Sequence, residues 1–378
     1  MKRRSFSHWT IALALGAYMI TPALAADSTS WPDPVDNPAE IMPLTAQSLL
    51  LGLAHGANGY VAVGGRGDIV LSDDAVNWKQ TQVPTRSTLT AVAAVGANVW
   101  AVGHDGVIVH SADGGLHWQL QRKDPWHAPA DDAPVDPRQG APLLGVIFTD
   151  AKHGFAVGAY SLALRTDDGG AHWREITIAA QPKGGADADT DMDADSSDAA
   201  KSGSDQSGNA KMTFSKSQLK IGQEPTPHLN AITRTGSGAL FIVGERGASF
   251  RSRDDGKTWQ RQQLPYDGSM FGVIGFEADH VLAFGLRGHV FESTDLGEHW
   301  TQVASGTQLS LMGGTGLPDD GVAIVGANGI VLMRAKGGEP LTSYVDQPAG
   351  TITEALPLGD SGNLVLAGEN GVSVYNPR

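Results

Sequence analysis

Apolar and polar positions alternate along this chain in short runs that are separated by glycine-rich turns. The run at 89–96 ("LTAVAAVG") is small and apolar, and "NVWAVG" at 98–103 and "VIVHS" at 107–111 follow it. A fourth run, "HWQLQRK", occupies 117–123. Short runs bounded by turn residues predict β-strands, and we find no sustained 3.6-residue period that would predict a helix. The pattern therefore predicts an all-β chain.

This unit of four runs recurs, and a glycine closes the second run of each copy. The seven glycines are Gly64, Gly103, Gly158, Gly244, Gly285, Gly326 and Gly368. Most neighbouring glycines are about 40 residues apart, which is the length of a four-stranded propeller blade. The repeat predicts a single seven-bladed β-propeller of four-stranded antiparallel blades over residues 48–378.

The last unit has three runs, near 351–358, 363–368 and 371–375, and no fourth. The stretch "PAEIMPLTAQ" at 38–47 directly precedes the first unit. We expect the N-terminal segment 26–47 to supply the outer strand of the seventh blade and so to close the ring, because such pairing removes an open strand edge.

An octet with the pattern S/T-x-D-x-G-x-x-W follows the third run of four units. The copies are "SADGGLHW" (111–118), "TDDGGAHW" (166–173), "SRDDGKTW" (252–259) and "STDLGEHW" (293–300), with the shorter "SDDAVNW" at 72–78. The pattern resembles the Asp-box turn of sialidases and related propellers. We interpret it as structural, with the aspartate bonding turn amides and the tryptophan packing between blades. The residues concerned are Asp74, Trp78, Asp113, Trp118, Asp168, Trp173, Asp254, Trp259, Asp295 and Trp300.

Two insertions lengthen the regular spacing. Residues 123–141 form a proline-rich loop, and residues 179–228 contain an aspartate-rich stretch with few apolar residues. The latter predicts a solvated, disordered linker. Its alternating aspartates lack the glycine and the closing glutamate of an EF-hand calcium loop, so we expect no metal site there.

The N-terminus has the layout of a cleaved export signal. Basic residues precede an apolar run, and small residues end it near residue 25. We expect residues 1–25 to direct export to the periplasm, or to the thylakoid lumen in a photosynthetic source, through the general secretory route rather than the twin-arginine route. No later run is long enough to span a membrane.

Charge and composition exclude several kinds of function. The formal net charge is −14, and cleavage of the signal would make it more negative. Nucleic-acid binding requires clustered cations, so it is disfavoured. The chain has no cysteine and therefore no disulfide or thiolate metal site. No hydrolase or nucleotide-binding motif occurs, so we assign no catalytic residue, cofactor or metal.

The best candidate site lies at the hairpin between the second and third runs. The residue two positions after each ladder glycine is, around the ring, Arg66, Asp105, Tyr160, Arg246, Arg287, Asn328 and Asn370. Asparagine and aspartate suit such a turn, but arginine in three blades is less expected. A guanidinium cluster would bind carboxylate, phosphate or an acidic surface, and Trp126 in the 123–141 loop would add contact area. Exposed turns also tolerate long solvated side chains, so both readings remain open.

The repeated unit "AVG-x-x-G-x-[IV]-x-x-S-x-D-G-G-x-x-W" resembles the photosystem II stability and assembly factor family over nearly all of 48–375. The resemblance implies an exported propeller that assists the assembly of a membrane complex, either a photosystem or a resistance-nodulation-division transporter. It also implies an arginine patch, to which Arg66, Arg246 and Arg287 would correspond.

The sequence thus favours a non-catalytic, monomeric protein that binds a membrane-protein partner without spanning the membrane itself. The alternative is a glycan-active enzyme of the sialidase or glycosyl hydrolase kind, or a lectin, that would use the axial pocket of the ring.

Overall fold

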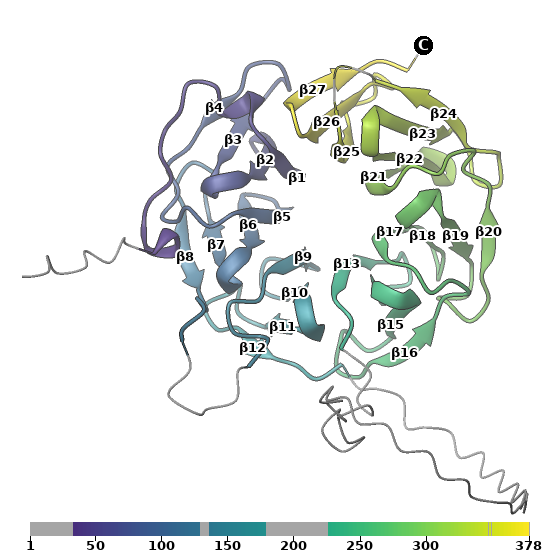
Figure 1. Cartoon of the computed structure of the whole chain (residues 1–378), viewed down its shortest axis with the longest axis horizontal. Helices are drawn as coiled ribbons and strands as arrows, with labels where there is room; N and C mark the ends of the chain where they lie inside the picture. Colours follow the sequence, from purple (N-terminus) through teal and green to yellow (C-terminus); the bar gives the residue numbers. More distant parts are fainter. Residues whose placement is uncertain (1–32, 129–135, 179–225, 347, 349, 378) are drawn as a thin grey trace, which may run out of the picture. The chain divides into compact units, whose positions relative to one another are not determined.

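The glycine-marked runs become the strands of seven antiparallel sheets that surround a central axis (Figure 1). The computed structural model describes residues 33–128, 136–178, 226–346, 348 and 350–377. The innermost strand of the first sheet contacts the innermost strands of both the second and the seventh, so the ring is closed. The predicted seven-bladed propeller is confirmed. The predicted signal and most of the 179–228 insertion lie outside the described residues.

Each blade begins with an inner pair of strands. The innermost strands are β1 (Leu50–Gly56), β5 (Leu89–Val95), β9 (Leu143–Phe148), β13 (Leu229–Arg234), β17 (Met270–Gly275), β21 (Leu311–Leu317) and β25 (Ile352–Pro357). The second strands are β2 (Gly59–Gly64), β6 (Asn98–Gly103), β10 (Gly154–Gly158), β14 (Leu240–Gly244), β18 (Val281–Gly285), β22 (Gly321–Gly326) and β26 (Leu364–Gly368). Every second strand ends at its ladder glycine.

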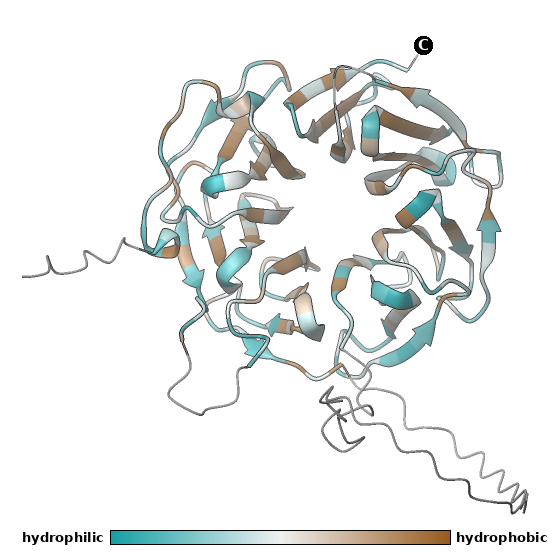
Figure 2. Ribbon diagram, in the orientation of Figure 1, coloured by the Kyte–Doolittle hydropathy of each residue, from teal (hydrophilic) through white to brown (hydrophobic). Residues whose placement is uncertain are grey.

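The outer part of each blade is shorter. The third strands are β3 (Ile69–Ser72), β7 (Ile108–Ser111), β11 (Ala163–Thr166), β15 (Ala248–Ser252), β19 (Val290–Ser293), β23 (Ile330–Arg334) and β27 (Gly371–Tyr375). Six blades have a fourth strand: β4 (Lys79–Gln80), β8 (Gln119–Arg122), β12 (Arg174–Glu175), β16 (Gln260–Gln263), β20 (Thr301–Val303) and β24 (Thr342–Val345). Brown apolar strands fill the blade interiors in Figure 2, and the outermost strands are more polar.

One turn of 3₁₀ helix joins the second and third strands in six blades. These turns are η3 (Gly65–Gly67), η4 (His104–Gly106), η5 (Ala159–Ser161), η6 (Glu245–Gly247), η7 (Leu286–Gly288) and η9 (Ala327–Gly329). The other short helices are η1 (Pro34–Asp36), η2 (Thr45–Gln47) and η8 (Pro318–Asp320). In blade 7 a two-residue turn replaces the 3₁₀ turn.

The Asp boxes form self-bonded turns between the third and fourth strands. In the second blade Oδ1 of Asp113 accepts hydrogen bonds from the amides of Leu116 (3.1 Å) and His117 (2.9 Å), and Oγ of Ser111 accepts one from Gly115 (2.8 Å). Hydrogen bonds from the His117 side chain and from the His117 amide lower the pKa of Asp113. The carboxylate is thus used by the turn itself.

Each Asp-box tryptophan packs against the preceding blade. Trp118 of blade 2 lies in one cluster with Val61 and Val63 of blade 1, and Trp259 of blade 4 meets Phe155 of blade 3 edge to face. Trp78 of blade 1 packs with the core of blade 7, which carries the same contact across the point of ring closure.

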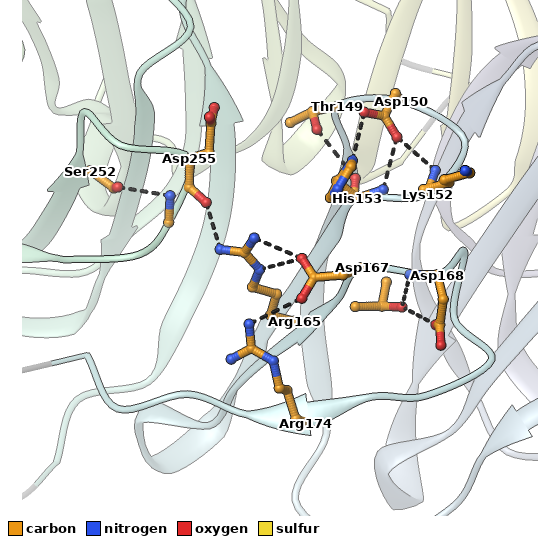
Figure 3. A network of polar contacts seen from close by, with 12 residues as sticks. Thr149, Asp150, Lys152, His153, Arg165, Asp167, Asp168, Arg174, Ser252 and Asp255 are labelled. Atoms are coloured by element: carbon orange, nitrogen blue, oxygen red, sulfur yellow. Dashed lines mark hydrogen bonds and ion pairs between the residues drawn. The ribbon is translucent and has the colours of Figure 1, made fainter.

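Polar contacts also link neighbouring blades through the Asp boxes. Figure 3 shows Arg165 of β11 between its own blade and the next: Nη1 donates to the carbonyl of Asp255 at 2.7 Å, and Nε donates to Asp167 at 2.8 Å. Arg251 of β15 makes the equivalent bond to the carbonyl of Leu296 at 3.2 Å. The Asp box is therefore an inter-blade part as well as a turn.

The predicted closing strand is absent from the described residues. The seventh sheet has three strands, and the described residues before β1 contain two short 3₁₀ helices and no strand. Two prolines, Pro38 and Pro43, remove amide donors from the stretch that would have paired. Blade 1 binds this stretch instead: Gln82 Nε2 donates to the carbonyl of Ala39 at 2.8 Å, and Gln80 Oε1 accepts from the amide of Met42 at 2.7 Å.

The N-terminal segment still closes the ring, but by another contact. Gly329 in the hairpin of blade 6 lies against Asp346, which belongs to the connection into blade 7. Gly371 of blade 7 lies in the same way against Ala46 of η2, where an added Cβ would come within 2.0 Å of the Ala46 carbonyl oxygen. The segment before β1 thus occupies the place of an inter-blade connection.

Candidate functional site on the hairpin face

The 3₁₀ turns and the segments that enter each blade lie on one face of the ring. The amide of Glu245 donates to the carbonyl of His228 at 3.0 Å, and the amide of Leu286 donates to the carbonyl of Ser269 at 2.9 Å. His228 and Ser269 directly precede the innermost strands of blades 4 and 5. The Asp boxes join strands three and four and therefore lie at the opposite ends of the strands. We call the first surface the hairpin face and the second the Asp-box face.

The middle residue of each 3₁₀ turn has a left-handed backbone. Its φ lies between 54° and 57° at all six positions, which are Arg66, Asp105, Tyr160, Arg246, Arg287 and Asn328. Asparagine and aspartate adopt this conformation readily, whereas arginine and tyrosine do so at greater cost. Turn chemistry therefore accounts for Asp105 and Asn328 but not for the other four. Left-handed residues of other types often mark functional positions.

The structure brings two of the three predicted arginines to neighbouring blades. Arg246 lies on blade 4 and Arg287 on blade 5, both are exposed, and neither forms an ion pair within the described residues. Arg66 lies on blade 1, beyond blades 6 and 7, and its Nη2 is 3.7 Å from Oδ2 of the buried Asp68. Arg246 and Arg287 thus occupy equivalent turn positions on adjacent blades, and Arg66 stands apart from them.

A cavity of about 550 Å³ adjoins Arg246 on the same blade. Its lining includes Arg261 of β16, Asp267 and Pro227. Sequence reasoning did not identify Arg261, because it lies in an outer strand whose alternation gives no sign that the side chain faces the hairpin surface. The cavity lining combines two arginines, Arg246 and Arg261, with two carboxylates, Glu245 and Asp267.

Tyr160 reaches this same region from blade 3. Its ring meets His228 edge to face with centroids 4.9 Å apart, and it is 38% exposed. The backbone amide of His228 donates to Oε2 of Glu245 at 3.1 Å, which fixes the residue that precedes Arg246. Tyr160 of blade 3 is thereby followed along the face by His228 and then by Arg246 of blade 4.

Trp126 lies near Asp105 rather than near the arginines. The amide of Asp124 donates to the carbonyl of Asp105 at 2.7 Å, and the amide of Gly140 donates back to Asp124 at 3.0 Å. Trp126 packs on Gly140 and remains 55% exposed. The described part of the 123–141 loop therefore presents one large apolar side chain on the hairpin face of blade 2.

The last two predicted residues have simpler surroundings. Asn328 is an exposed turn residue of blade 6. Asn370 does not have a left-handed backbone, and its Nδ2 donates to the carbonyl of Pro348 at 2.9 Å. Asn370 therefore holds the connection between blades 6 and 7 in place.

The axial cavity is a separate feature, of about 210 Å³, lined by the innermost strands. Six blades place glycine or alanine at the lining position that pairs with the residue before the ladder glycine: Gly52, Ala91, Gly145, Ala231, Gly272 and Gly313. Blade 7 places Glu354 there, and its Oε1 accepts from the amides of Gly314 (2.9 Å) and Ala355 (3.0 Å). Burial raises the pKa of Glu354 to about 7.

Glu354→Gln should stabilise the protein at alkaline pH. Glutamine can keep both amide contacts while removing the charge. Because the folded pKa lies above the usual 4.5, the wild type loses stability as pH rises from about 4.5 through 7, by about 3 kcal/mol in all. Urea unfolding should show that the variant has a higher free energy of unfolding than the wild type at pH 8 but not at pH 5. The exposed Glu339→Gln serves as control, and an equal effect at both pH values would contradict the shift.

The described residues contain no group of three or more histidine and acidic side chains placed to hold a metal ion. Within these same residues we also find no helix with the length and apolarity needed to cross a bilayer.

Comparison with known proteins agrees with the predicted resemblance. The family model described as "Photosynthesis system II assembly factor YCF48" matches residues 210–372. The photosystem II assembly protein Ycf48 of Synechococcus sp. strain JA-3-3Ab is 42% identical over 50 residues, which are 12% of this chain and 15% of the relative. The photosystem II assembly lipoprotein Ycf48 of strain CC9605 is 37% identical over 62 residues, 16% of this chain and 17% of the relative. The aligned segments thus span under a fifth of the length of these relatives.

A solved structure described as "YCF48 bound to D1 peptide" has a similar fold. Its TM-score is 0.59 at 16% identity, and the match covers 92% of this chain and 98% of that one. At this identity the likeness extends to the fold alone. The family model and the Ycf48 relatives confirm the resemblance to the photosystem II assembly factor family.

Proposed function

We propose that the protein is a non-catalytic assembly or accessory factor that binds a subunit of a membrane-protein complex through its hairpin face. The observation that carries the proposal is the pair Arg246 and Arg287. Both arginines have a left-handed backbone, which arginine adopts only at a cost. Both guanidinium groups are exposed on a chain of net charge −14. Such groups bind a carboxylate through paired, charge-assisted hydrogen bonds.

The surroundings of the pair favour a peptide-like partner. Tyr160 and His228 offer aromatic surface beside Arg246, and the adjacent cavity provides room for side chains. Arginine and tyrosine are the residues that most often dominate protein interfaces. We infer that Arg246 and Arg287 hold an acidic segment of the partner, and that Arg66, Asp105, Asn328, Asn370 and Trp126 contribute contacts farther around the face.

The relatives support the same assignment. They are described as photosystem II assembly proteins, in one case a lipoprotein, and the YCF48 of similar fold was solved with a D1 peptide. We propose that this chain acts outside the cytoplasm, after export by its N-terminal segment, on a photosystem or on a transporter of the resistance-nodulation-division class.

The glycan-active alternative lacks support from the axial cavity. Hydrolysis of a glycoside generally requires two carboxyl groups that flank the bond. Glu354 is the one carboxyl residue among the described residues that line this cavity.

Changing Arg246 and Arg287 together to glutamate should abolish capture of the partner without lowering the melting temperature, because both side chains are exposed and neither forms an ion pair within the described residues. Crosslinking of tagged protein in intact cells, followed by mass spectrometry, measures the capture. The control changes Lys257 and Lys336 to glutamate, which alters the charge equally on the exposed Asp-box face. Equal capture by the arginine variant and the wild type would refute the proposal.

A further inference from the structure

The outer edge of blade 7 is incomplete. β27 takes the position of a third strand, and in the other six blades the third strand is almost wholly buried beneath a fourth. In β27 the consecutive residues Ser373 and Val374 are both exposed, Val374 to 39%. One strand position at the rim is therefore vacant within the described residues.

The backbone of β27 offers hydrogen-bonding groups to this vacant position. In blade 1 the carbonyl of Ile69 accepts from the amide of Thr81 at 3.0 Å, and Ile69 pairs on its other side with Val63. Val372 is the equivalent residue of blade 7, since it pairs with Ala367, the residue before the ladder glycine. Antiparallel pairing alternates inward and outward groups, so Val372 and Val374 both direct their amide and carbonyl outward.

No described residue bonds to these outward groups. The described part of the N-terminal segment does not supply them, because residues 34–44 follow blade 1 and η2 lies across the start of β27, at Gly371 and Val372. Exposed edge strands are usually protected from pairing with other chains by proline or by charged residues such as lysine. Gly371–Tyr375 contains no proline and no charged residue.

The groove beside β27 indicates what would fit there. Its volume is about 260 Å³, and Ile352, Leu366 and Val374 supply apolar lining while Asp346 supplies a carboxylate. Val345 at the end of β24 is 53% exposed, and Leu44 beside η2 is 65% exposed. An occupant with apolar side chains at alternate positions and a basic residue near Asp346 matches this surface.

We propose that β27 binds an extended segment of a partner protein, apolar at alternate positions and basic at one end, which adds to blade 7 as its fourth strand. Backbone hydrogen bonds supply the affinity in this mode of recognition, and pockets for alternate side chains supply the specificity. A second copy of this chain fits less well. It would bring another Asp346 and a second net charge of −14 to the same edge.

A peptide of the chain's own sequence tests the proposal. Residues 117–123, "HWQLQRK", include β8, the fourth strand of blade 2, and have the required alternation and basic end. The labelled, terminally blocked peptide should bind the full chain saturably in a fluorescence anisotropy titration. Val374→Pro removes one outward amide while leaving the bonds to β26, and should weaken binding about tenfold or more. Val374→Thr keeps the amide and should bind within about threefold of the wild type.

Controls separate this site from the hairpin face. Circular dichroism verifies that Val374→Pro is folded, and the variant with Arg246 and Arg287 changed to glutamate should bind the peptide like the wild type. Absence of saturable binding, or equal binding by Val374→Pro, would overturn the proposal. Sedimentation showing a dimer that Val374→Pro dissociates would assign the edge to a second copy instead, and would overturn the partner assignment.

Discussion

Arg334→Met should destabilise the protein by about 3–5 kcal/mol, because it leaves the carboxylate of Glu292 without its main cation inside the blade 5–blade 6 interface. The Arg334 side chain is 1% exposed and that of Glu292 is 18% exposed. Nη1 and Nη2 of Arg334 donate to the two carboxylate oxygens at 3.0 and 2.6 Å. His280 contacts Glu292 from within blade 5 at 2.7 Å. Chemical denaturation at neutral pH measures the loss.

This interface replaces the Asp-box contact used elsewhere in the ring. Blades 3 and 4 direct an arginine, Arg165 or Arg251, to a carbonyl in the next blade's Asp box. Blade 6 has no Asp box: Arg334 occupies the place of its first serine, and Glu292 occupies the place of the arginine in blade 5. At this interface the earlier blade therefore carries the carboxylate and the later blade carries the arginine. Each charged group is the main partner of the other.

The pH dependence of the loss has a defined direction. The hydrogen bond from His280, followed by those from Arg334, lowers the pKa of Glu292 from 4.5 to about 2 despite its burial. The stability that comes from this carboxylate is present above pH 4.5 and is lost as pH falls through 2. A double variant, Arg334→Met with Glu292→Leu, should recover most of the stability, since an apolar pair can replace a buried ion pair. A single Arg334→Met variant as stable as the wild type would contradict the account.

Deletion of residues 27–47 should lower stability by on the order of 5 kcal/mol, which corresponds to a fall in melting temperature of about 10 °C or more. Val35 is fully buried in the core shared by blades 1 and 2. The amide of Arg86 donates to the carbonyl of Pro34, and the amide of Ala39 donates to Val83, both at 2.9 Å. The deletion also removes η2 from Gly371 and so opens the contact between blades 7 and 1.

The matched control deletes residues 27–32 alone and leaves every one of these contacts in place. Differential scanning calorimetry should show a melting temperature near that of the wild type for the control and a large fall for the longer deletion. Equal melting temperatures for the two deletions would show that residues 33–47 do not close the ring.

The repeat in the sequence was sufficient to predict the ring. The second strand of each blade ends in glycine, and the Asp box has aspartate and tryptophan at fixed positions. These residues satisfy local requirements of turns and packing that are the same in any blade. The strands at 98–103 and 371–375 occur as predicted. Local chemistry repeated in register can be interpreted without knowledge of long-range contacts.

The true position of the N-terminal segment could not be predicted in this way. It depends on whether blade 1 or blade 7, both distant from the segment's own local pattern, binds its backbone. Nothing in "PAEIMPLTAQ" reveals that Gln80, Gln82 and Arg86 of blade 1 bind its backbone. The same limit applies to Arg261 and Glu354, since their positions beside a cavity follow from how blades meet. The predicted hairpin residues were found on one face. Which of the arginines are neighbours, Arg246 with Arg287 and not Arg66, follows from the order of the blades around the ring.

Site-specific photocrosslinking in intact cells tests most directly whether the hairpin face binds the partner. A photoreactive phenylalanine analogue at Tyr160, beside Arg246, is compared with the same analogue at His172, which is 90% exposed on the Asp-box face. The account predicts one dominant membrane-protein adduct from position 160, lost when Arg246 and Arg287 are changed to glutamate, and none from position 172. An adduct with the same protein from position 172 alone would contradict it.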